Sequence, residues 1–359
     1  HYSQNGAGAA RDPFQWRSRL SDRRHRLGGI YDDNMIDVLK AGAASVLPGW
    51  GMAQDTDVSL LTVSENATFL ATDPNSGAKR ILRVHRPGYH TRAEIESELA
   101  WINALRAADV VDTPKPRLRS DGSLVAEFDQ GGVSRHVVAF DFMSGSEPSA
   151  DEALVDGFFK LGAISARLHG HARQWTRSVN FVRKSWTFDT TLGANPHWGD
   201  WRAAPGLDAD GLELLERLCS HLDQKLSTFG MGNDRFGLIH ADLRLANLLV
   251  DGERLGVIDF DDCGFGWFGY DFAAAISFIE LDPIIPALKE AWIEGYRTVA
   301  PFSASDAAML DSFVMLRRLL LTAWIASHPE TPTAQEMGTG FTAGTLQMAQ
   351  DYLTAEGAK

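Results

Sequence analysis

The first half of the chain alternates short apolar runs with polar turns, which is the pattern of β-strands. Three runs predict consecutive strands at residues 57–63, 67–72 and 80–85. A turn at residues 74–77, which holds Pro, Asn, Ser and Gly, separates the second run from the third. Because the connections are short, we expect an antiparallel meander at the start of the fold.

Helical spacing flanks these strands on both sides. A first helix is predicted from residue 33 until a Pro-Gly pair ends it near residue 48. A second, at residues 91–108, begins with Thr91 and Glu94 in a capping-box pattern. Its apolar stripe also carries Glu98, and a carboxylate on a buried face needs a cation.

Beyond these elements the pattern returns briefly to strands and then becomes helical. A hairpin is predicted at residues 118–128 around the turn Asp121-Gly122, followed by a strand at 135–143. Residues 144–148 are rich in Ser, Gly and Pro and make the best domain boundary. Helices are predicted after it at residues 151–169, 207–229, 271–280, 286–299, 306–327 and 333–354.

A long irregular insertion at residues 175–201 interrupts these helices. Its four tryptophans are Trp175, Trp186, Trp198 and Trp201. Two interpretations stay open, because aromatic side chains on such a segment either line a substrate pocket or anchor the loop on the core.

Composition limits the kind of protein this is. At 359 residues with 44% hydrophobic content, the chain can bury one large or two medium cores, so two lobes are expected. A net charge of −13 disfavours nucleic acid or an anionic membrane as a partner and favours a neutral or cationic substrate. Cys219 and Cys263 lie far apart without zinc-like spacing, so neither a disulfide framework nor a zinc site is indicated.

The termini and the hydropathy add an expectation about location. Residues 1–30 are polar and locally basic, which predicts a flexible or loosely docked tail. There is no apolar run of 18 residues and no signal-peptide pattern. We therefore expect a soluble, cytoplasmic protein.

The candidate chemistry lies between residues 236 and 276. An apolar run at residues 236–239 opens into a polar loop that holds His240, Asp242, Arg244 and Asn247. A hairpin then brings Asp259 back to the same edge of a small sheet. Hard oxygen ligands in this arrangement suit Mg²⁺ bridging phosphates, with one carboxylate left to orient a nucleophile.

These motifs resemble a known family. The sequence HADLRLAN is similar to the catalytic loop of the protein-kinase-like fold, and VIDFDD to its metal-binding segment as found in aminoglycoside phosphotransferases, choline kinases and homoserine-kinase-like enzymes. The resemblance extends over residues 57–300 and implies an α+β fold with two lobes. An antiparallel-sheet N-lobe would span residues 31–143, and a mainly helical C-lobe with the catalytic loop would span residues 144–359.

The resemblance also assigns roles around the catalytic loop. Asp242 would orient the acceptor hydroxyl and accept its proton, and Arg244 would stabilise charge on the transferring group. Asn247 and Asp259 would hold Mg²⁺, with Asp261 as a further acid at the metal. Asp271 would brace the catalytic loop through its backbone.

The nucleotide site follows from the same resemblance. Arg83 occupies the place of the strand lysine that holds the α and β phosphates of ATP, and Glu98 is its expected partner, with Glu94 as the reserve candidate. A Glu98 exposed at the edge of the stripe is the other interpretation. Backbone around Ser64 and Asn66 would cover the phosphates. Backbone from Asp141 to Met143 would meet adenine.

Other classes remain possible at this level. A protein kinase needs a longer activation segment than the stretch between Asp259 and Asp271 allows, whereas a non-catalytic nucleotide-binding module would be consistent with arginine at residue 83. A dinucleotide-binding fingerprint at residues 264–269 is disfavoured, because nearby acids would repel a pyrophosphate.

The sequence does not identify the acceptor. Homoserine, choline, ethanolamine, an aminoglycoside, a sugar and an acyl conjugate all remain possible. We predict an acceptor with an amine or quaternary ammonium, held by acidic and aromatic side chains beside the metal segment. The candidates are Asp261, Asp262, Trp267 and Tyr270.

Overall fold

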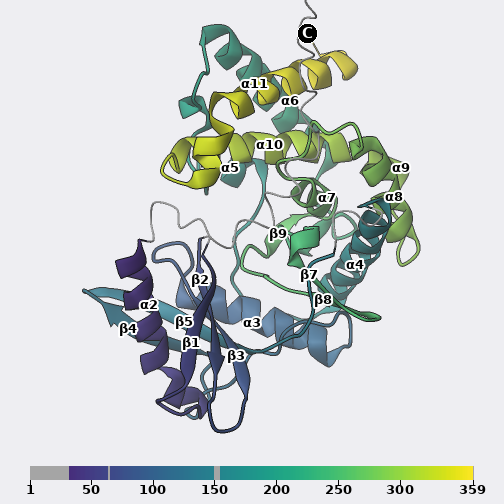
Figure 1. The fold of residues 1–359 in the computed structure, drawn as a ribbon. Helices are drawn as coiled ribbons and strands as arrows, with labels where there is room; N and C mark the ends of the chain where they lie inside the picture. Colours follow the sequence, from purple (N-terminus) through teal and green to yellow (C-terminus); the bar gives the residue numbers. More distant parts are fainter. Residues whose placement is uncertain (1–31, 64, 149–153, 359) are drawn as a thin grey trace, which may run out of the picture.

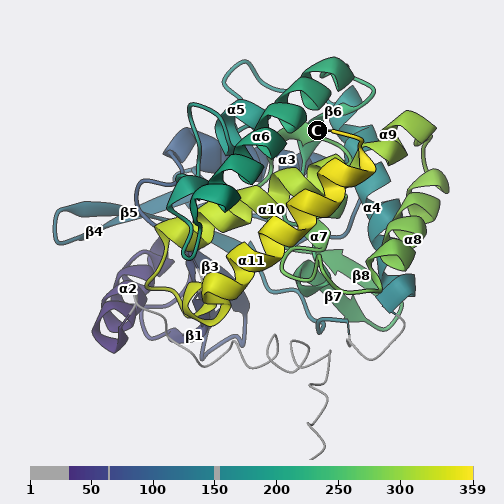
Figure 2. The same cartoon turned by 90° about the horizontal axis from the view of Figure 1, so that it is seen from above.

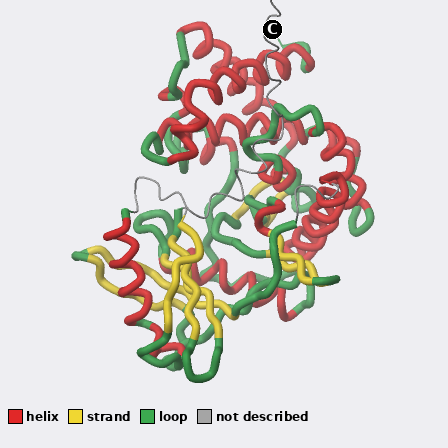
Figure 3. The backbone as a smooth tube through the Cα atoms, viewed as in Figure 1, coloured by secondary structure: helices red, strands yellow, loops and turns green. Residues whose placement is uncertain are grey.

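The computed structural model describes residues 32–63, 65–148 and 154–358. The predicted tail at residues 1–30 therefore lies outside the described residues. A sheet-rich N-terminal part and a helical C-terminal part lie one above the other in Figure 1, and the separation of strands from helices is plain in Figure 3. This division agrees with the α+β organisation predicted from the sequence.

A five-stranded antiparallel sheet forms the N-terminal part, in the order β1-β2-β3-β5-β4. The strands are β1 Asp57–Val63, β2 Ala67–Thr72, β3 Lys79–Val84, β4 Val125–Gln130 and β5 Val133–Asp141. The predicted meander is confirmed, with the third strand shifted by one residue.

Two helices cover the opposite faces of this sheet. Helix α2 (Asp33–Ser45) packs Leu39 against one face, in a cluster that includes Val137 and Ala139 of β5. The alternate β5 residues Val138 and Phe140 join the other cluster, together with helix α3 (Arg92–Ala107). The period-2 alternation of a strand thus places one helix on each side.

The predicted hairpin at residues 118–128 is wrong. Asp121-Gly122 does form a turn, with Gly122 at φ 81°, but the described chain has no strand between helix α3 and this turn. The hairpin lies between β4 and β5, where Gly131 (φ 61°) and Gly132 (φ 88°) both adopt the left-handed conformation. A Gly-Gly pair accommodates positive φ at both positions, which makes it the stronger hairpin signal.

Helix α3 begins as predicted. Thr91 accepts a hydrogen bond from the backbone of Glu94, and the Glu94 carboxylate accepts one from the backbone of Thr91. The helix buries Ile95, Leu99, Ile102 and Leu105, and it buries Glu98 completely. Glu98 therefore faces the core rather than solvent.

The C-terminal part is built from helices around one large core. They are α4 Leu154–Gln174, α5 Phe188–Thr191, α6 Ala209–Phe229, α7 Tyr270–Ala275, α8 Ile285–Arg297, α9 Ala304–Ala308, α10 Leu310–Ser327 and α11 Pro332–Ala355. Figure 2 shows α6, α10 and α11 side by side, and α10 also packs on α7. Almost every residue of α10 is buried, so this helix lies at the centre of the C-terminal part.

The predicted C-terminal helices are confirmed with shifted ends. The segment predicted at 306–327 divides into α9 and α10, and α7 ends at Ala275 instead of residue 280. A kink at Gly338, where φ is 47°, interrupts α11. Along the described chain no helix is long and apolar enough to cross a membrane.

Two small sheets position the polar loop. Strand β6 (Phe236–Ile239) pairs with β9 (Gly264–Trp267), and β7 (Leu248–Asp251) pairs with β8 (Arg254–Val257). The sequence analysis did not predict β9. Glycine is needed in β9 for close packing, because a Cβ on Gly264 would collide with the backbone of Lys184. The described residues 264–269 form a strand and its end, and they do not form a dinucleotide-binding turn.

The chain passes from β5 into the C-terminal part through residues 142–148. Ser146 and Val250 of β7 exchange backbone hydrogen bonds of 3.0 and 2.8 Å, so this connection is fixed to the second small sheet. The predicted domain boundary at residues 144–148 falls in this segment and stays a prediction. Cys219 and Cys263 are both free and buried.

Candidate active site

The catalytic loop is held by one buried carboxylate. Asp271 accepts hydrogen bonds from the backbone N–H groups of His240 (3.3 Å) and Ala241 (2.7 Å). Ala241 needs this support, because its φ of 64° is unfavourable for a residue with a side chain. The predicted bracing role of Asp271 is confirmed. His169 completes the brace, with its Nε2 2.9 Å from Asp271 Oδ2.

His240 has a structural role beneath the loop. Its Nε2 donates to the Ile258 carbonyl oxygen (3.1 Å), and its Nδ1 accepts from the backbone N–H of Asp242 (3.3 Å). Burial lowers the pKa of His240. The side chain is therefore a neutral imidazole that ties the catalytic loop to the strand leading into the metal segment.

Asp242 lies between two arginines. Arg244 Nε is 3.1 Å from Asp242 Oδ1, and Arg317 Nη2 is 3.5 Å from the same oxygen. Asn247 Nδ2 donates to Asp242 Oδ2 at 3.1 Å. Since both hydrogen bonds of the Asn247 side chain to Asp242 use the amide nitrogen, its amide oxygen is the atom suited to a cation.

Asp259 is the exposed acid of the site. Its side chain is 51% exposed, and its backbone has φ 62°. The half of the side chain that is buried loses water, and this raises the pKa of Asp259 to about 7; Arg83 works against the shift, whereas Asp261 and Asp242 add to it. Carboxylates crowded in this way repel each other, and a divalent cation would relieve the repulsion. The donor set of Asn247 and Asp259 thus fits Mg²⁺.

Asp261 has different surroundings. Asn66 Nδ2 donates to its Oδ2 at 2.8 Å, while His85 Nδ1 and Arg83 Nη2 lie 3.5 and 3.8 Å from its Oδ1. Although burial works against the charge, the neighbouring cation and imidazoles hold the pKa of Asp261 well below its usual range. These contacts favour Asp261 as a partner of Arg83. Its predicted role at the metal stays a prediction.

The predicted pair of Arg83 and Glu98 is confirmed. Arg83 Nη2 donates to both Glu98 oxygens, at 2.8 and 2.6 Å. Burial alone would lower the pKa of Arg83, but Glu98, Asp261 and Asp259 together raise it. The guanidinium stays charged, with Nη1 3.7 Å from Asp259, as required of a phosphate-holding group. Glu94, the reserve candidate, binds Lys184 instead.

The loop between β1 and β2 joins the two parts of the molecule. Asn66 accepts from the backbone N–H of Arg86 (3.0 Å) as well as donating to Asp261. Its side chain is thus used within the protein, and contact with phosphates would fall to backbone. Ser64 lies outside the described residues. Sequence reasoning did not single out Glu65, whose Oε1 accepts from Trp324 Nε1 at 3.1 Å.

The predicted adenine-contact segment lies at the end of β5. The Asp141 carboxylate lies 3.3 Å from Arg80, and the Asp141 backbone N–H donates to Lys115. Met143 packs on Gly256 of β8, where a Cβ would collide with the Met143 sulfur. Met143 therefore lies where the sheet meets the C-terminal part, and its contact with adenine stays a prediction.

Asp262 heads an acidic and aromatic group beside the catalytic loop. Tyr89 donates to Asp262 Oδ1 (2.8 Å), and Trp198 Nε1 donates to the Tyr89 hydroxyl (3.2 Å). Burial raises the pKa of Asp262 to about 8, and Glu65, Asp261 and Asp242 add to this. Carboxyl groups from several elements thus converge on one place.

The two aromatic candidates from the sequence are core residues. Trp267 donates to the Gly230 carbonyl oxygen (2.8 Å) and stacks on Phe313. Tyr270 is fully buried, and its hydroxyl accepts from Arg317. Trp186, Trp198 and Trp201 of the insertion are all buried, and two of them contact this acidic group: Trp186 Nε1 donates to the Asp262 carbonyl oxygen (2.9 Å) and Trp198 Nε1 to the Tyr89 hydroxyl.

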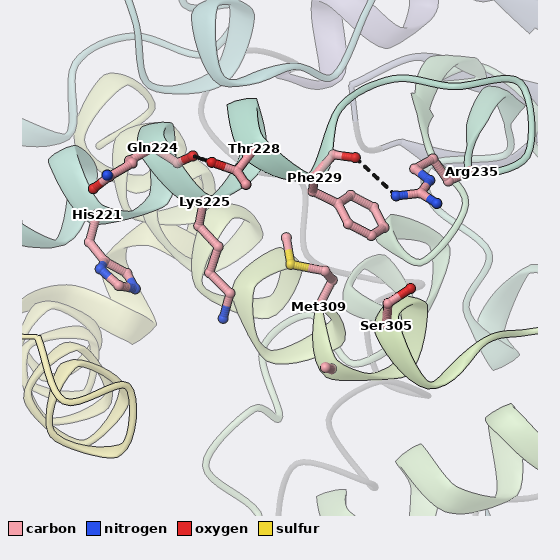
Figure 4. Close-up of a pocket in the computed structure, with 9 residues that line it drawn as sticks. His221, Gln224, Lys225, Thr228, Phe229, Arg235, Ser305 and Met309 are labelled. Carbon is pink, nitrogen blue, oxygen red and sulfur yellow. Dashed lines mark hydrogen bonds between the residues drawn. The ribbon is translucent and has the colours of Figure 1, made fainter.

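An open cavity of about 500 Å³ lies elsewhere, between α6 and α9 (Figure 4). Lys225 and Arg235 line it together with both polar and apolar neighbours, and Lys225 is paired with Glu356 at 2.6 Å. Its lining contains no acid of the catalytic loop or the metal segment.

Comparison with known proteins agrees with this geometry. The model of the phosphotransferase enzyme family matches residues 59–302. A microcompartment-associated aminopropanol kinase of known structure is 45% identical; the match covers 88% of this chain and 98% of that one, with a TM-score of 0.82.

More distant relatives are also named as kinases of small molecules. An amicoumacin kinase solved with AMP-PNP, Ca²⁺ and Ami shares the fold at 22% identity, with 92% and 96% coverage and a TM-score of 0.71. A homoserine kinase of Neisseria meningitidis is 36% identical over 42% of this chain and 47% of its own. The protein-kinase-like fold and the family resemblance are confirmed, and the chain belongs to the phosphotransferase enzyme family of small-molecule kinases.

Proposed function

We propose that this kinase transfers the γ-phosphoryl group of ATP, with Mg²⁺, to the hydroxyl of a small amino alcohol. The observation that carries this proposal is the 45% identity to an aminopropanol kinase over nearly its whole length. The match to a homoserine kinase also involves an acceptor with both a hydroxyl and an amine, although it covers only half of that protein.

The side chains beside Asp242 support a cationic acceptor. Asp262 and Glu65 contribute carboxyl groups from two different elements. Burial is the main cause of the raised pKa of Asp262, and nearby Glu65 raises it further. The indoles of Trp198 and Trp324 attach to this group through Tyr89 and Glu65. An ammonium group there would favour the ionised form of Asp262 and would contact the aromatic faces, and it would share Glu65 with Arg86, which lies 3.1 Å from the other Glu65 oxygen.

Catalysis would use the residues of the catalytic loop. As the acceptor oxygen bonds to the γ-phosphorus and the bond to ADP breaks, Asp242 accepts the hydroxyl proton. Arg244, with a side chain 27% exposed, would turn from Asp242 to the transferring group and stabilise its charge.

The nucleotide would be held from the N-terminal part. Arg83, fixed by Glu98, would bind phosphate oxygens through its planar guanidinium. Asn247 and Asp259 would hold Mg²⁺, which when bound neutralises charge on the phosphates. Backbone between Asp141 and Met143 would meet adenine.

A matched pair of acceptors tests this proposal. ADP release would be measured with 1-amino-2-propanol and with 1,2-propanediol, which differ in having an ammonium or a hydroxyl group. We expect kcat/KM to be at least about tenfold higher for the amino alcohol, the scale of one desolvated cation contact. Ethanolamine and homoserine would follow in the same assay. Turnover of neutral diols or anionic hydroxy acids without turnover of amino alcohols would show that the proposal is wrong.

Variants of the acidic group locate the amine. Asp262→Asn and Glu65→Gln should raise the KM of the amino alcohol while leaving the KM of ATP within about twofold. Glu253→Gln, in the exposed turn between β7 and β8, is the control. Equal KM values in all three variants would place the amine elsewhere.

A further inference from the structure

A second arginine reaches the catalytic aspartate from helix α10. Arg317 Nη2 lies 3.5 Å from Asp242 Oδ1, although the two residues are far apart in sequence. Arg317 also lies beyond residues 59–302, which the family model matches. Nothing in the catalytic-loop pattern therefore predicts it.

The guanidinium of Arg317 is fixed on several sides. Its Nε donates to Ser277 Oγ (3.1 Å) and its Nη1 to the Tyr270 hydroxyl (3.3 Å). The Trp198 ring packs over it, with 5.0 Å between the Arg317 Cζ atom and the ring centroid. The residue is only 3% exposed. Five N–H donors in a rigid plane suit such a site, and the many contacts leave the side chain little freedom.

Arg244 makes a different contact with the same carboxylate. It comes from the catalytic loop itself, and its side chain is 27% exposed compared with 4% for Arg317. The two cations repel each other across Asp242. When Arg244 turns to the transferring phosphoryl group, Arg317 is the cation that remains beside Asp242.

We propose that Arg317 is a positioning residue for Asp242, a fixed positive charge that keeps the carboxylate oriented toward the acceptor hydroxyl while Arg244 serves the phosphoryl group. The inference rests on the proposed role of Asp242 in the reaction. It adds a residue of the C-terminal helices to the machinery of the catalytic loop. Burying a guanidinium is costly unless its donors are paired, and here those donors bind Asp242, Tyr270 and Ser277.

The adjacent residue on the same helix provides a matched control. Arg318 is also 3% exposed, but it binds Glu280 (2.7 Å) and Thr345 (2.8 Å), on the side of α10 that meets α11. Arg317→Gln and Arg318→Gln each remove one buried guanidinium from α10. Only the first removes a charge from Asp242, so a loss caused by weaker packing would appear in both variants.

The readout is the rate of ADP release at saturating MgATP and amino alcohol. For Arg317→Gln we expect kcat to fall by about 10²-fold with the Kd of MgATP within about twofold, as for an interaction that matters only during turnover. Arg318→Gln should keep kcat within about threefold at a comparable loss of Tm. Arg317→Lys keeps the positive charge and should recover part of the rate. If Arg317→Gln does not fold, the kcat of Arg317→Lys is compared with that of the wild type instead.

A second comparison separates positioning from packing. If Arg317 acts through Asp242, then Arg317→Gln should lower the rate little further in an Asp242→Asn background. Added methylguanidinium should raise the turnover of Arg317→Ala and leave Arg318→Ala unchanged.

Three outcomes would overturn the inference. The first is a kcat of Arg317→Gln within twofold of the wild type, and the second is a loss in Arg318→Gln as large as that in Arg317→Gln or full additivity with Asp242→Asn. The third is a rise only in the KM of anionic acceptors, which would make Arg317 an acceptor-binding residue. If Asp242→Asn keeps its full turnover, the proposed function of Asp242 is wrong. If Asp242→Asn is inactive but Arg317→Gln is fully active, only the inference about Arg317 is wrong.

Discussion

Arg83 binds both carboxylate oxygens of Glu98 through a single nitrogen, Nη2, at 2.8 and 2.6 Å. This geometry leaves Nη1 on the side of Asp259, 3.7 Å away. A guanidinium can therefore satisfy the helix carboxylate and still present a donor toward the catalytic acids. The arginine at this strand position is compatible with the task of holding phosphates.

This pair should behave as one unit. Glu98→Gln removes the charge that orients Arg83, and we expect the KM of MgATP to rise about tenfold or more, the scale of a lost charged hydrogen bond. The change should add little to the loss already caused by Arg83→Ala. A double-mutant cycle in kcat/KM checks this, and Glu96→Gln, whose carboxylate pairs with Arg92 at the surface, is the control. Fully additive losses would show that the two residues act independently.

Asp271 offers a test of the brace beneath the catalytic loop. Asp271→Asn turns one acceptor oxygen into a donor facing the backbone N–H groups of His240 and Ala241. We expect the free energy of unfolding to fall by about 2 kcal/mol, together with a lower kcat. Denaturant unfolding and ADP release would be measured beside Asp311→Asn, an exposed partner of Lys289. A stable variant with full turnover would contradict the bracing role.

The sequence was most informative where the chemistry is local. Asp242, Asn247 and Asp259 lie in one short stretch, so their spacing alone predicted a shared site. The partner of Arg83 could also be predicted, because Glu98 interrupts the apolar stripe of its helix and a buried carboxylate requires a cation.

Residues brought to the site by tertiary packing could not be found this way. Glu65 and Trp324 are 259 residues apart in sequence. In the sequence of helix α10, nothing distinguishes Arg317 from the other polar residues of this mainly apolar helix. Trp267 shows the opposite error, since its position next to the metal segment in sequence suggested a ligand contact that its burial does not support. In the N-terminal sheet, the hairpin predicted around Asp121-Gly122 forms instead around Gly131-Gly132, because it is β4 and β5 that pair.

Gly256 should control the adenine end of the nucleotide site. Gly256→Ala places a Cβ against the Met143 sulfur, so the Met143 side chain and the adjoining backbone must move. We expect the KM of ATP to rise about threefold to tenfold, because small misplacements of a binding segment weaken binding, while the KM of the acceptor stays unchanged. Gly170→Ala is the control, since a Cβ there meets open space. If the two variants share one KM for ATP, Met143 does not line the adenine site.

Substitutions of Asp242 and Asp259 should cause different defects. Asp259→Asn removes a charged ligand from Mg²⁺, so metal-dependent nucleotide binding and phosphoryl transfer should both fall. Asp242 makes its contacts with Arg244, Arg317 and Asn247, and its proposed role is to orient the acceptor hydroxyl rather than to hold the metal. Asp242→Asn should therefore bind MgATP almost normally while kcat falls by roughly 10² or more, the scale of losing a positioned base.

Calorimetric titration with MgATP, run beside the ADP-release assay, distinguishes the two variants. Titration with ATP in the presence of a chelator is the control, because the loss of affinity in Asp259→Asn should vanish when the metal is removed from both proteins. Two carboxylates in a merely solvated loop would not produce such a split between binding and turnover. The assignment requires weak MgATP binding in the first variant and slow turnover with intact binding in the second. An Asp242→Asn protein that retained its turnover would falsify the role of this residue as the base, because no other carboxylate of the described loop between β6 and β7 could replace it.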